Sequence, residues 1–133
     1  FLHIDEEKFF ISGESSIGFP GNTTRIALAI CYELSVPEHA EDAFKNGAKI
    51  YIASVAKTMN GIDKALTRLA DIAKKYSMTV LMSNCIGQAD GHECAGKTSI
   101  WNNKGLLAGQ LNNTNEGILI IETGTKEVIE KTI

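Results

Sequence analysis

Residues 25–38 read RIALAICYELSVPE and join a short apolar run to a stretch with the marks of a helix start. The run at residues 25–31 is short, apolar and preceded by turn-forming residues, which predicts a buried strand. Ser35 and Glu38 have the spacing of a capping box, and Pro37 fits the first turn of a helix, where no backbone N–H is needed. This stretch therefore predicts a strand and a helix in close succession.

The rest of the chain continues this alternation. Residues 49–55 and 78–84 predict two more buried strands, and residues 60–76 between them form the clearest helix, with apolar side chains along one face. Short apolar runs separated by Asn/Gly turns follow and predict further strands, at residues 98–102, 105–111 and 117–123. The order predicts an α/β domain in which helices pack on a sheet and the tail adds strands to the same layers.

Residues 1–24 are rich in Gly, Ser and Thr, which predicts a loop that ends in a turn at Pro20-Gly21. The chain begins FLHIDEEKFF, without an initiator Met or a helix-capping signal. We therefore expect the first part of a larger protein to be missing from it.

Composition excludes several classes of protein. The 133 residues suffice for one domain with one core, and the 44% hydrophobic content is that of an ordinary globular protein. No apolar run approaches the roughly 20 residues that span a bilayer. The net charge of −3, with no basic stripe, argues against nucleic acid or an anionic membrane as a partner. No Cys/His cluster has zinc spacing, so neither a metal nor another cofactor is expected.

The three cysteines are Cys31, Cys85 and Cys94. Their odd number and the absence of a CxxC pair predict free thiols in a reducing compartment, with the cytoplasm as the default. Cys85 is interpreted as a buried filler and Cys94 as a loop thiol.

Two interpretations of Cys31 stay open on the residues alone. A free cysteine is most often a small buried apolar side chain. Cys31, however, ends a predicted strand just before a turn, and ligands of α/β sheets bind at the carboxyl ends of strands. The histidines that could activate it are all predicted to be surface residues; they are His3, His39 and His92. The acids Asp5, Glu6 and Glu7 are read as a solvated turn or as partners of the thiol.

Five segments in order resemble the nitrilase superfamily, the carbon–nitrogen hydrolases. They read DEEKFFISG, RIALAICYELSVPE, NGAKIYIASVA, LTRLADIAKKYSMTVLMSNCIG and AGKTSIWNNKGLLAG. The resemblance runs from about Leu2 to about Glu122. It implies an α-β-β-α sandwich and a Glu-Lys-Cys triad with a second Glu, in which the cysteine attacks an amide or nitrile carbon.

The resemblance implies roles for particular residues. Cys31 matches the nucleophile, the Tyr32 N–H matches an oxyanion donor, and Glu6 matches the second Glu, with Glu7 as the alternative. Possible pocket residues are Glu33, which could instead orient the nucleophile turn, and Ser54, Val55 and Ala56. Asn84 is read equally as a turn cap or a pocket residue. The family's first Glu and its Lys have no match, since Lys8 and Lys57 lie outside the Lys motif.

We therefore expect residues 1–133 to form about the second half of a carbon–nitrogen hydrolase domain, inactive alone, with one apolar sheet face left open. The expected activity is cleavage of a carboxamide or N-carbamoyl C–N bond in preference to a nitrile, through a thioacyl intermediate on a small-molecule amide. A non-catalytic binding or assembly module and an unrelated Cys/His hydrolase are the alternatives. The resemblance also implies a homodimer or larger homo-oligomer.

Overall fold

A computed structural model describes residues 1–2, 4–13 and 24–133 of the chain. His3 and the turn predicted at Pro20-Gly21 lie outside these residues. Among the described residues, no helix combines the length and apolar character needed to cross a membrane.

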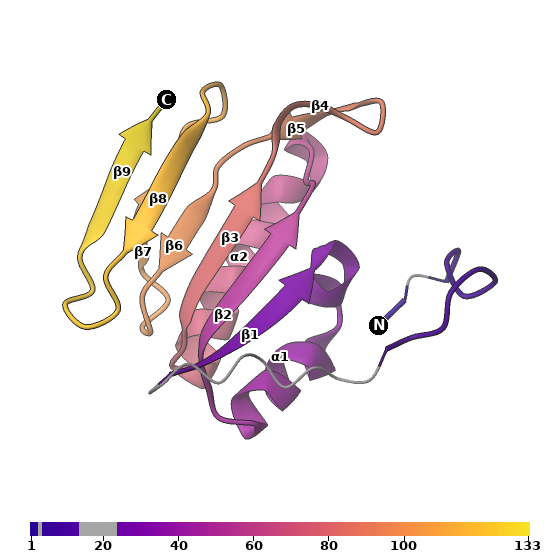
Figure 1. Cartoon of the computed structure of the whole chain (residues 1–133), viewed down its shortest axis with the longest axis horizontal. Coiled ribbons are helices and arrows are strands. Elements are labelled where there is room, and N and C mark those ends of the chain that lie inside the picture. The colour runs from indigo at the N-terminus through magenta and orange to yellow at the C-terminus, as the bar shows by residue number, and fades with distance from the viewer. Residues whose placement is uncertain (3, 14–23) are drawn as a thin grey trace.

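The main sheet has five strands in the order β1-β2-β3-β6-β7 (Figure 1). Three of them are parallel and correspond to the predicted buried strands: β1 (Arg25–Ile30), β2 (Ala48–Val55) and β3 (Thr79–Asn84). The tail then adds β6 (Ser99–Trp101) and β7 (Leu107–Gln110) as antiparallel neighbours. The carboxyl ends of β1, β2 and β3 therefore meet along one edge of the sheet.

Two helices connect the parallel strands and lie on the same side of the sheet, behind it in Figure 1. Helix α1 (Pro37–Lys45) joins β1 to β2, and α2 (Met59–Tyr76) joins β2 to β3. Ile62 and Leu69 of α2 are fully buried, as their helical spacing predicts. The predicted mixed α/β fold is confirmed.

The predicted capping box at Ser35 and Glu38 is wrong. Ser35 belongs instead to a short 3-10 turn, η1 (Cys31–Ser35), and Val36 takes the position before α1 without a side-chain cap. The chain needs this extra turn to pass from the end of β1 to the helix layer. Pro37 does begin the helix, as expected.

The tail is only partly as predicted. Strands β4 (Ile86–Ala89) and β5 (His92–Ala95) form a separate hairpin that the sequence analysis missed. Strands β8 (Gly117–Ile121) and β9 (Val128–Thr132) pair with each other as another two-stranded sheet. This second pair lies beyond β7 in Figure 1, and β7 contacts β9.

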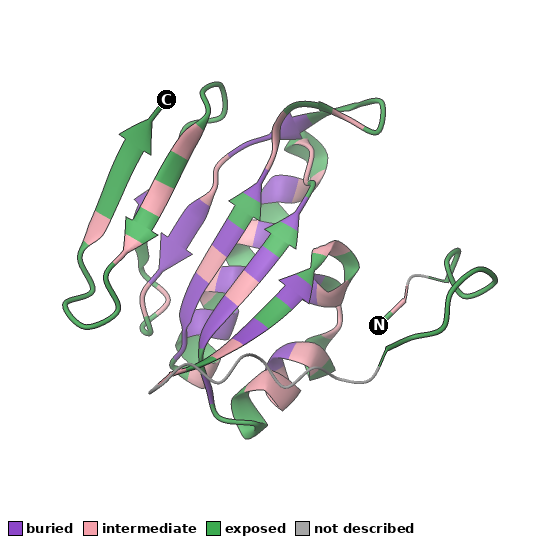
Figure 2. Cartoon of the chain, viewed as in Figure 1, coloured by how far each residue is buried: buried purple, intermediate pink, exposed green. Residues whose placement is uncertain are grey.

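The face of the main sheet opposite the helices is apolar and open. Leu28 and Ile30 of β1 are 42% and 68% exposed, whereas Ala27 and Ala29, which alternate with them, are buried. Figure 2 shows this alternation along β1. The structure therefore shows the open apolar face that was expected of one half of a two-sheet sandwich.

Candidate active site

Cys31 lies where β1 ends and is the first residue of η1. Its φ is +37°, a left-handed conformation that a side chain with a Cβ adopts at a cost. The thiol is free and partly exposed. A sharp, strained turn after a strand presents a side chain beyond the sheet edge while the strand holds its backbone, a geometry that enzymes use for nucleophiles.

Two side chains hold the turn that carries Cys31. The Glu33 carboxylate accepts a 2.9 Å hydrogen bond from the N–H of Ile30, the residue just before the cysteine. The Arg68 guanidinium, on α2, donates a 2.9 Å hydrogen bond to the carbonyl of Leu34. The turn is thus fixed at its start by its own acid and near its end by the helix layer.

Glu33 remains ionised in this position. Burial opposes its charge, but the hydrogen bond from the Ile30 N–H favours the charged form, and the pKa of the carboxyl is lowered. His39 adds to this effect, with its Nε2 atom 3.6 Å from Glu33 Oε2. Glu33 was predicted either to line a pocket or to orient the nucleophile turn. Its contacts are of the kind that orient the turn.

The prediction that His39 is a surface residue is wrong. Its side chain is 16% exposed, and its Nδ1 atom lies 2.9 Å from the hydroxyl of the fully buried Tyr51. The cause is the packing of α1 on β2, which the sequence pattern of α1 alone does not show. Burial lowers the pKa of His39, although Glu33 opposes this shift. His92 is exposed, as predicted.

The predicted pocket residues at the end of β2 lie next to the cysteine turn but point in different directions. Ser54 is paired with Ile30 across the β1–β2 ladder, so it lies beside the residue that precedes Cys31. Ser54 and Ala56 are exposed, whereas Val55 between them belongs to the core under the helices. Tyr32, immediately after the cysteine, is 39% exposed.

Asn84, at the end of β3, connects three segments through its side chain. Its Oδ1 atom accepts a 2.7 Å hydrogen bond from the Lys57 N–H. Its Nδ2 atom donates to the carbonyls of Lys57 and Gly96, at 3.1 and 2.7 Å. All of its side-chain bonds go to backbone, so Asn84 is a structural cross-link at the sheet edge. Of its two readings, the structural one fits these contacts.

The prediction that all three cysteines are free is wrong, because Cys85 and Cys94 form a disulfide. The antiparallel pairing of β4 with β5 places Ile86 opposite Ala95 and so brings the two cysteines together. Their separation of nine residues gave no hint of this pairing. Because two of the three cysteines are paired, free thiols no longer support a reducing compartment. The cytoplasmic location stays a prediction.

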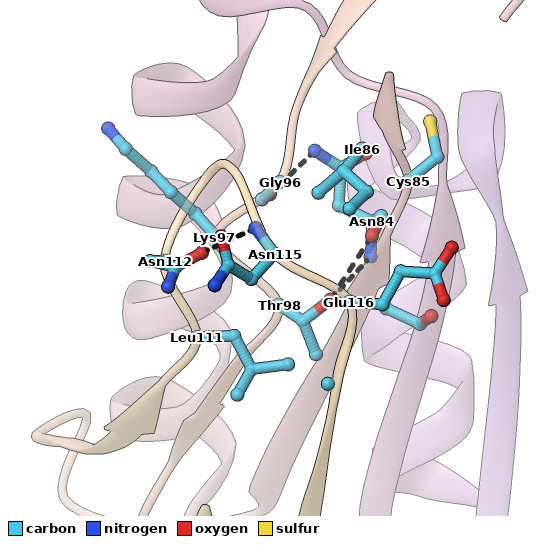
Figure 3. Close-up of a pocket in the computed structure, with 12 residues that line it drawn as sticks. Asn84, Cys85, Ile86, Gly96, Lys97, Thr98, Leu111, Asn112, Asn115 and Glu116 are labelled. Atoms are coloured by element: carbon cyan, nitrogen blue, oxygen red, sulfur yellow. Dashed lines mark hydrogen bonds between the residues drawn. The ribbon is translucent and has the colours of Figure 1, made fainter. Parts of the chain in front are cut away.

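A cavity of about 320 Å³ opens at the carboxyl end of β3 (Figure 3). It lies between three segments that are distant in the sequence, at residues 83–86, 96–98 and 111–117. This cavity could not be predicted from the sequence, because only the fold brings these segments together. Cys31 does not line it, since β2 separates β1 from β3 and two strand spacings amount to about 10 Å.

Glu6 lies in an exposed turn, in which its carbonyl accepts hydrogen bonds from the N–H groups of Phe9 and Phe10 at 2.9 and 3.0 Å. Figure 1 shows this turn on the outer side of β1, well away from the ends of the strands. Among the described residues, no group of three His, Cys, Asp or Glu side chains is placed to hold a metal ion.

One protein family and several solved structures are similar to this chain. The family model described as carbon-nitrogen hydrolase matches residues 3–130. No curated protein sequence gives a match.

Solved structures share the fold at low identity. The NitN amidase of Nesterenkonia sp. AN1 is 20% identical with a TM-score of 0.69, over 85% of this chain and 45% of the amidase. A cysteine-to-alanine mutant of the amidase from this organism, in complex with butyramide, is 16% identical with a TM-score of 0.71, over 100% and 47%. Saccharomyces cerevisiae Nit3, a member of branch 10 of the nitrilase superfamily, is 15% identical with a TM-score of 0.74, over 95% and 43%. The chain spans less than half the length of each.

Proposed function

Because the chain belongs to the carbon–nitrogen hydrolase family, we propose that the protein carrying it hydrolyses a non-peptide C–N bond with Cys31 as the nucleophile. The observation that carries this proposal is the strained, partly exposed position of Cys31 at the end of β1. A carboxamide or an N-carbamoyl compound is the preferred substrate class over a nitrile. Structures of mutants of the Nesterenkonia amidase with butyramide, and with the acetamide moiety of fluoroacetamide added covalently at the active-site cysteine, support an amide.

The proposed reaction has two halves. The Cys31 thiol passes its proton to a general base as its sulfur attacks the amide carbon. The C–N bond then breaks and the amine leaves with that proton, so that a thioester to Sγ remains. A water oxygen then attacks the thioester carbon, releasing the carboxylic acid and restoring the thiol. The Tyr32 N–H, adjacent to the sulfur, is the proposed donor to the oxygen on which negative charge develops in both halves.

The remaining groups of the reaction are assigned by resemblance. The family's general base is a Glu and its second oxyanion donor is a Lys, and neither has a match in this chain. Glu6 is matched to the family's second Glu. Glu6 lies in an exposed turn ahead of β1, and its role in the reaction is proposed from the resemblance alone.

We also propose that residues 1–133 form the second half of a hydrolase domain. Two observations support this: the chain spans under half of its solved relatives, and its sheet has an open apolar face. In a two-sheet sandwich a second sheet covers such a face. The chain alone would then lack most of the activity, because triad groups act as a unit. A homodimer or larger homo-oligomer remains our expectation for the complete protein.

The test of the nucleophile is Cys31→Ala in the protein that carries this chain. We expect ammonia release from short aliphatic amides to fall to background, because the alanine has no attacking atom. His92→Ala, at an exposed position, is the matched control and should keep its rate. Ammonia release by Cys31→Ala at the wild-type rate would disprove the assignment. A wild-type protein that folds but releases no ammonia from any amide would favour the binding or assembly module instead.

The test of the acid is Glu6→Gln. If Glu6 acts in turnover, the variant should release ammonia at least tenfold more slowly, while iodoacetamide still alkylates Cys31. Glu7→Gln, one residue away in the same exposed turn, is the control. A slow Glu7→Gln beside a normal Glu6→Gln would show that the neighbouring acid is the correct match.

A further inference from the structure

Three polar side chains form a row behind the turn that carries Cys31. Tyr51 on β2 is fully buried, and its hydroxyl lies 2.9 Å from His39 Nδ1. The Nε2 atom on the other side of the His39 ring lies 3.6 Å from Glu33 Oε2. The same carboxylate oxygen accepts the 2.9 Å hydrogen bond from the Ile30 N–H. The row therefore runs from the core of the sheet to the backbone next to the cysteine.

The negative charge of Glu33, 3.6 Å from His39 Nε2, favours one direction for this row. An ionised carboxylate only accepts, so neutral His39 is favoured with its proton on Nε2, facing Glu33. Nδ1 is then an acceptor, and the Tyr51 hydroxyl is the donor that it requires. Burial keeps Tyr51 protonated by raising its pKa, and the charge of Glu33 acts in the same direction. The Tyr51 hydroxyl thus complements this tautomer and ring orientation of His39.

We propose that His39 and Tyr51 are positioning residues for Cys31, which act by holding the Glu33 carboxylate on the Ile30 N–H and so stabilising the strained turn. This proposal rests on the proposed role of Cys31 as nucleophile. Without the row, Glu33 would lose the contact of its Oε2 atom with His39 and would rotate away from the backbone more readily. The turn at Cys31 would then populate less strained conformations in which the sulfur and the Tyr32 N–H no longer face one point.

The other charged groups near the row do not replace it. The nitrogen of Phe1 lies 3.1 Å from Oε1 of Glu33 and also restrains this carboxylate, whereas His39 and the Ile30 N–H contact Oε2. Arg68 binds the Leu34 carbonyl and so fixes the far end of the turn. The row is therefore the support specific to the start of the turn.

The test uses Tyr51→Phe in the protein that carries this chain and needs no substrate. The first measurement is the rate at which iodoacetamide alkylates Cys31, followed by mass spectrometry of the tryptic peptide 26–45. The second is the imidazole ¹⁵N shifts of His39, which report its tautomer. We expect alkylation to slow about fivefold, the factor that one ordinary hydrogen bond carries, and the Nε2–H tautomer to lose its dominance.

Matched variants separate positioning from general damage. Tyr76→Phe removes a hydroxyl from the far end of α2 and should change neither measurement. Glu33→Ala should slow alkylation at least as much as Tyr51→Phe, and Glu33→Gln, which keeps an acceptor oxygen for the Ile30 N–H, should restore most of the rate. The Glu33 variants keep the proposal testable if Tyr51→Phe fails to fold.

The outcomes are distinguishable from those of the proposed function. Wild-type alkylation in Tyr51→Phe or in Glu33→Ala would overturn the positioning role, even if the protein is an amidase. Slowed alkylation with a changed His39 tautomer would support it, even if no amide is turned over. An unchanged tautomer in Tyr51→Phe would overturn the proposed direction of the row.

Discussion

Replacing Asn84 by alanine tests the cross-link at the edge of the sheet. The side chain is buried and makes three hydrogen bonds to backbone, two with Lys57 and one with Gly96. Each bond contributes about 1 kcal/mol, and the partners would lose it without ready access to water. We therefore expect Asn84→Ala to lower the free energy of unfolding by about 3 kcal/mol. The affected loop follows Ser54 and Ala56, so amide turnover should fall as well.

The assay is urea unfolding of the protein that carries this chain, followed by circular dichroism. With a slope of about 1–3 kcal/mol/M, a loss of about 3 kcal/mol moves the midpoint by about 1–3 M. Asn102→Ala is the matched control: Asn102 Oδ1 also accepts two backbone hydrogen bonds, from Lys104 and Leu106, but in an exposed turn where water can replace it. It should cost under about 1 kcal/mol.

A second substitution at the same position sharpens the test. Asn84→Asp keeps the shape and the acceptor for the Lys57 N–H, but directs a carboxylate oxygen at two carbonyl oxygens. It should be at least as destabilising as Asn84→Ala at neutral pH. Equal midpoints for Asn84→Ala and Asn102→Ala would refute the reasoning, because burial would then add nothing to the cost of losing these bonds.

Two further predictions concern the supports around the site. Arg68→Met keeps the aliphatic packing of the side chain but removes the hydrogen bond to the Leu34 carbonyl, so it should lower the free energy of unfolding in urea by about 1.5–3 kcal/mol. Lys64→Met, on the exposed side of α2, is the control and should leave the free energy of unfolding almost unchanged. Thiol titration of the denatured, unreduced chain should find one free cysteine and not three, and the double variant Cys85→Ser with Cys94→Ser should lose about 2–3 kcal/mol from the short loop that the disulfide closes. Three titratable thiols would contradict the disulfide.

The strands and helices that the sequence predicted are those with a strong apolar period. Residues 49–55 and 60–76 match β2 and α2 to within a residue. The order of apolar and polar side chains along each segment directly indicates which faces are buried. The missed β4–β5 hairpin had a signal of another kind. Asp90-Gly91 is a dipeptide typical of two-residue hairpin turns, and both residues have positive φ, +49° and +74°.

The candidate site was predicted unevenly for a related reason. Cys31 could be placed because its position depends on the strand just before it. His39 could not, because its burial depends on how α1 packs on β2, and its partner Tyr51 is twelve residues away on another element. The capping box at Ser35 and Glu38 failed because its pattern is satisfied by spacing alone, while the chain needed one more turn before the helix could begin.

By itself, the sequence determined that this chain alternates strands and helices and that a cysteine stands where the first strand ends. These features depend on residues that are close together in the sequence, so the local pattern of apolar and polar residues predicts them. Only the tertiary structure decided what surrounds that cysteine: Glu33 held between Ile30 and His39, Asn84 joined to Lys57, and two other cysteines joined to each other. Such contacts depend on strand register and helix packing. These bring together segments that are separate in the sequence, and the pattern of one segment does not indicate which other segment it will contact.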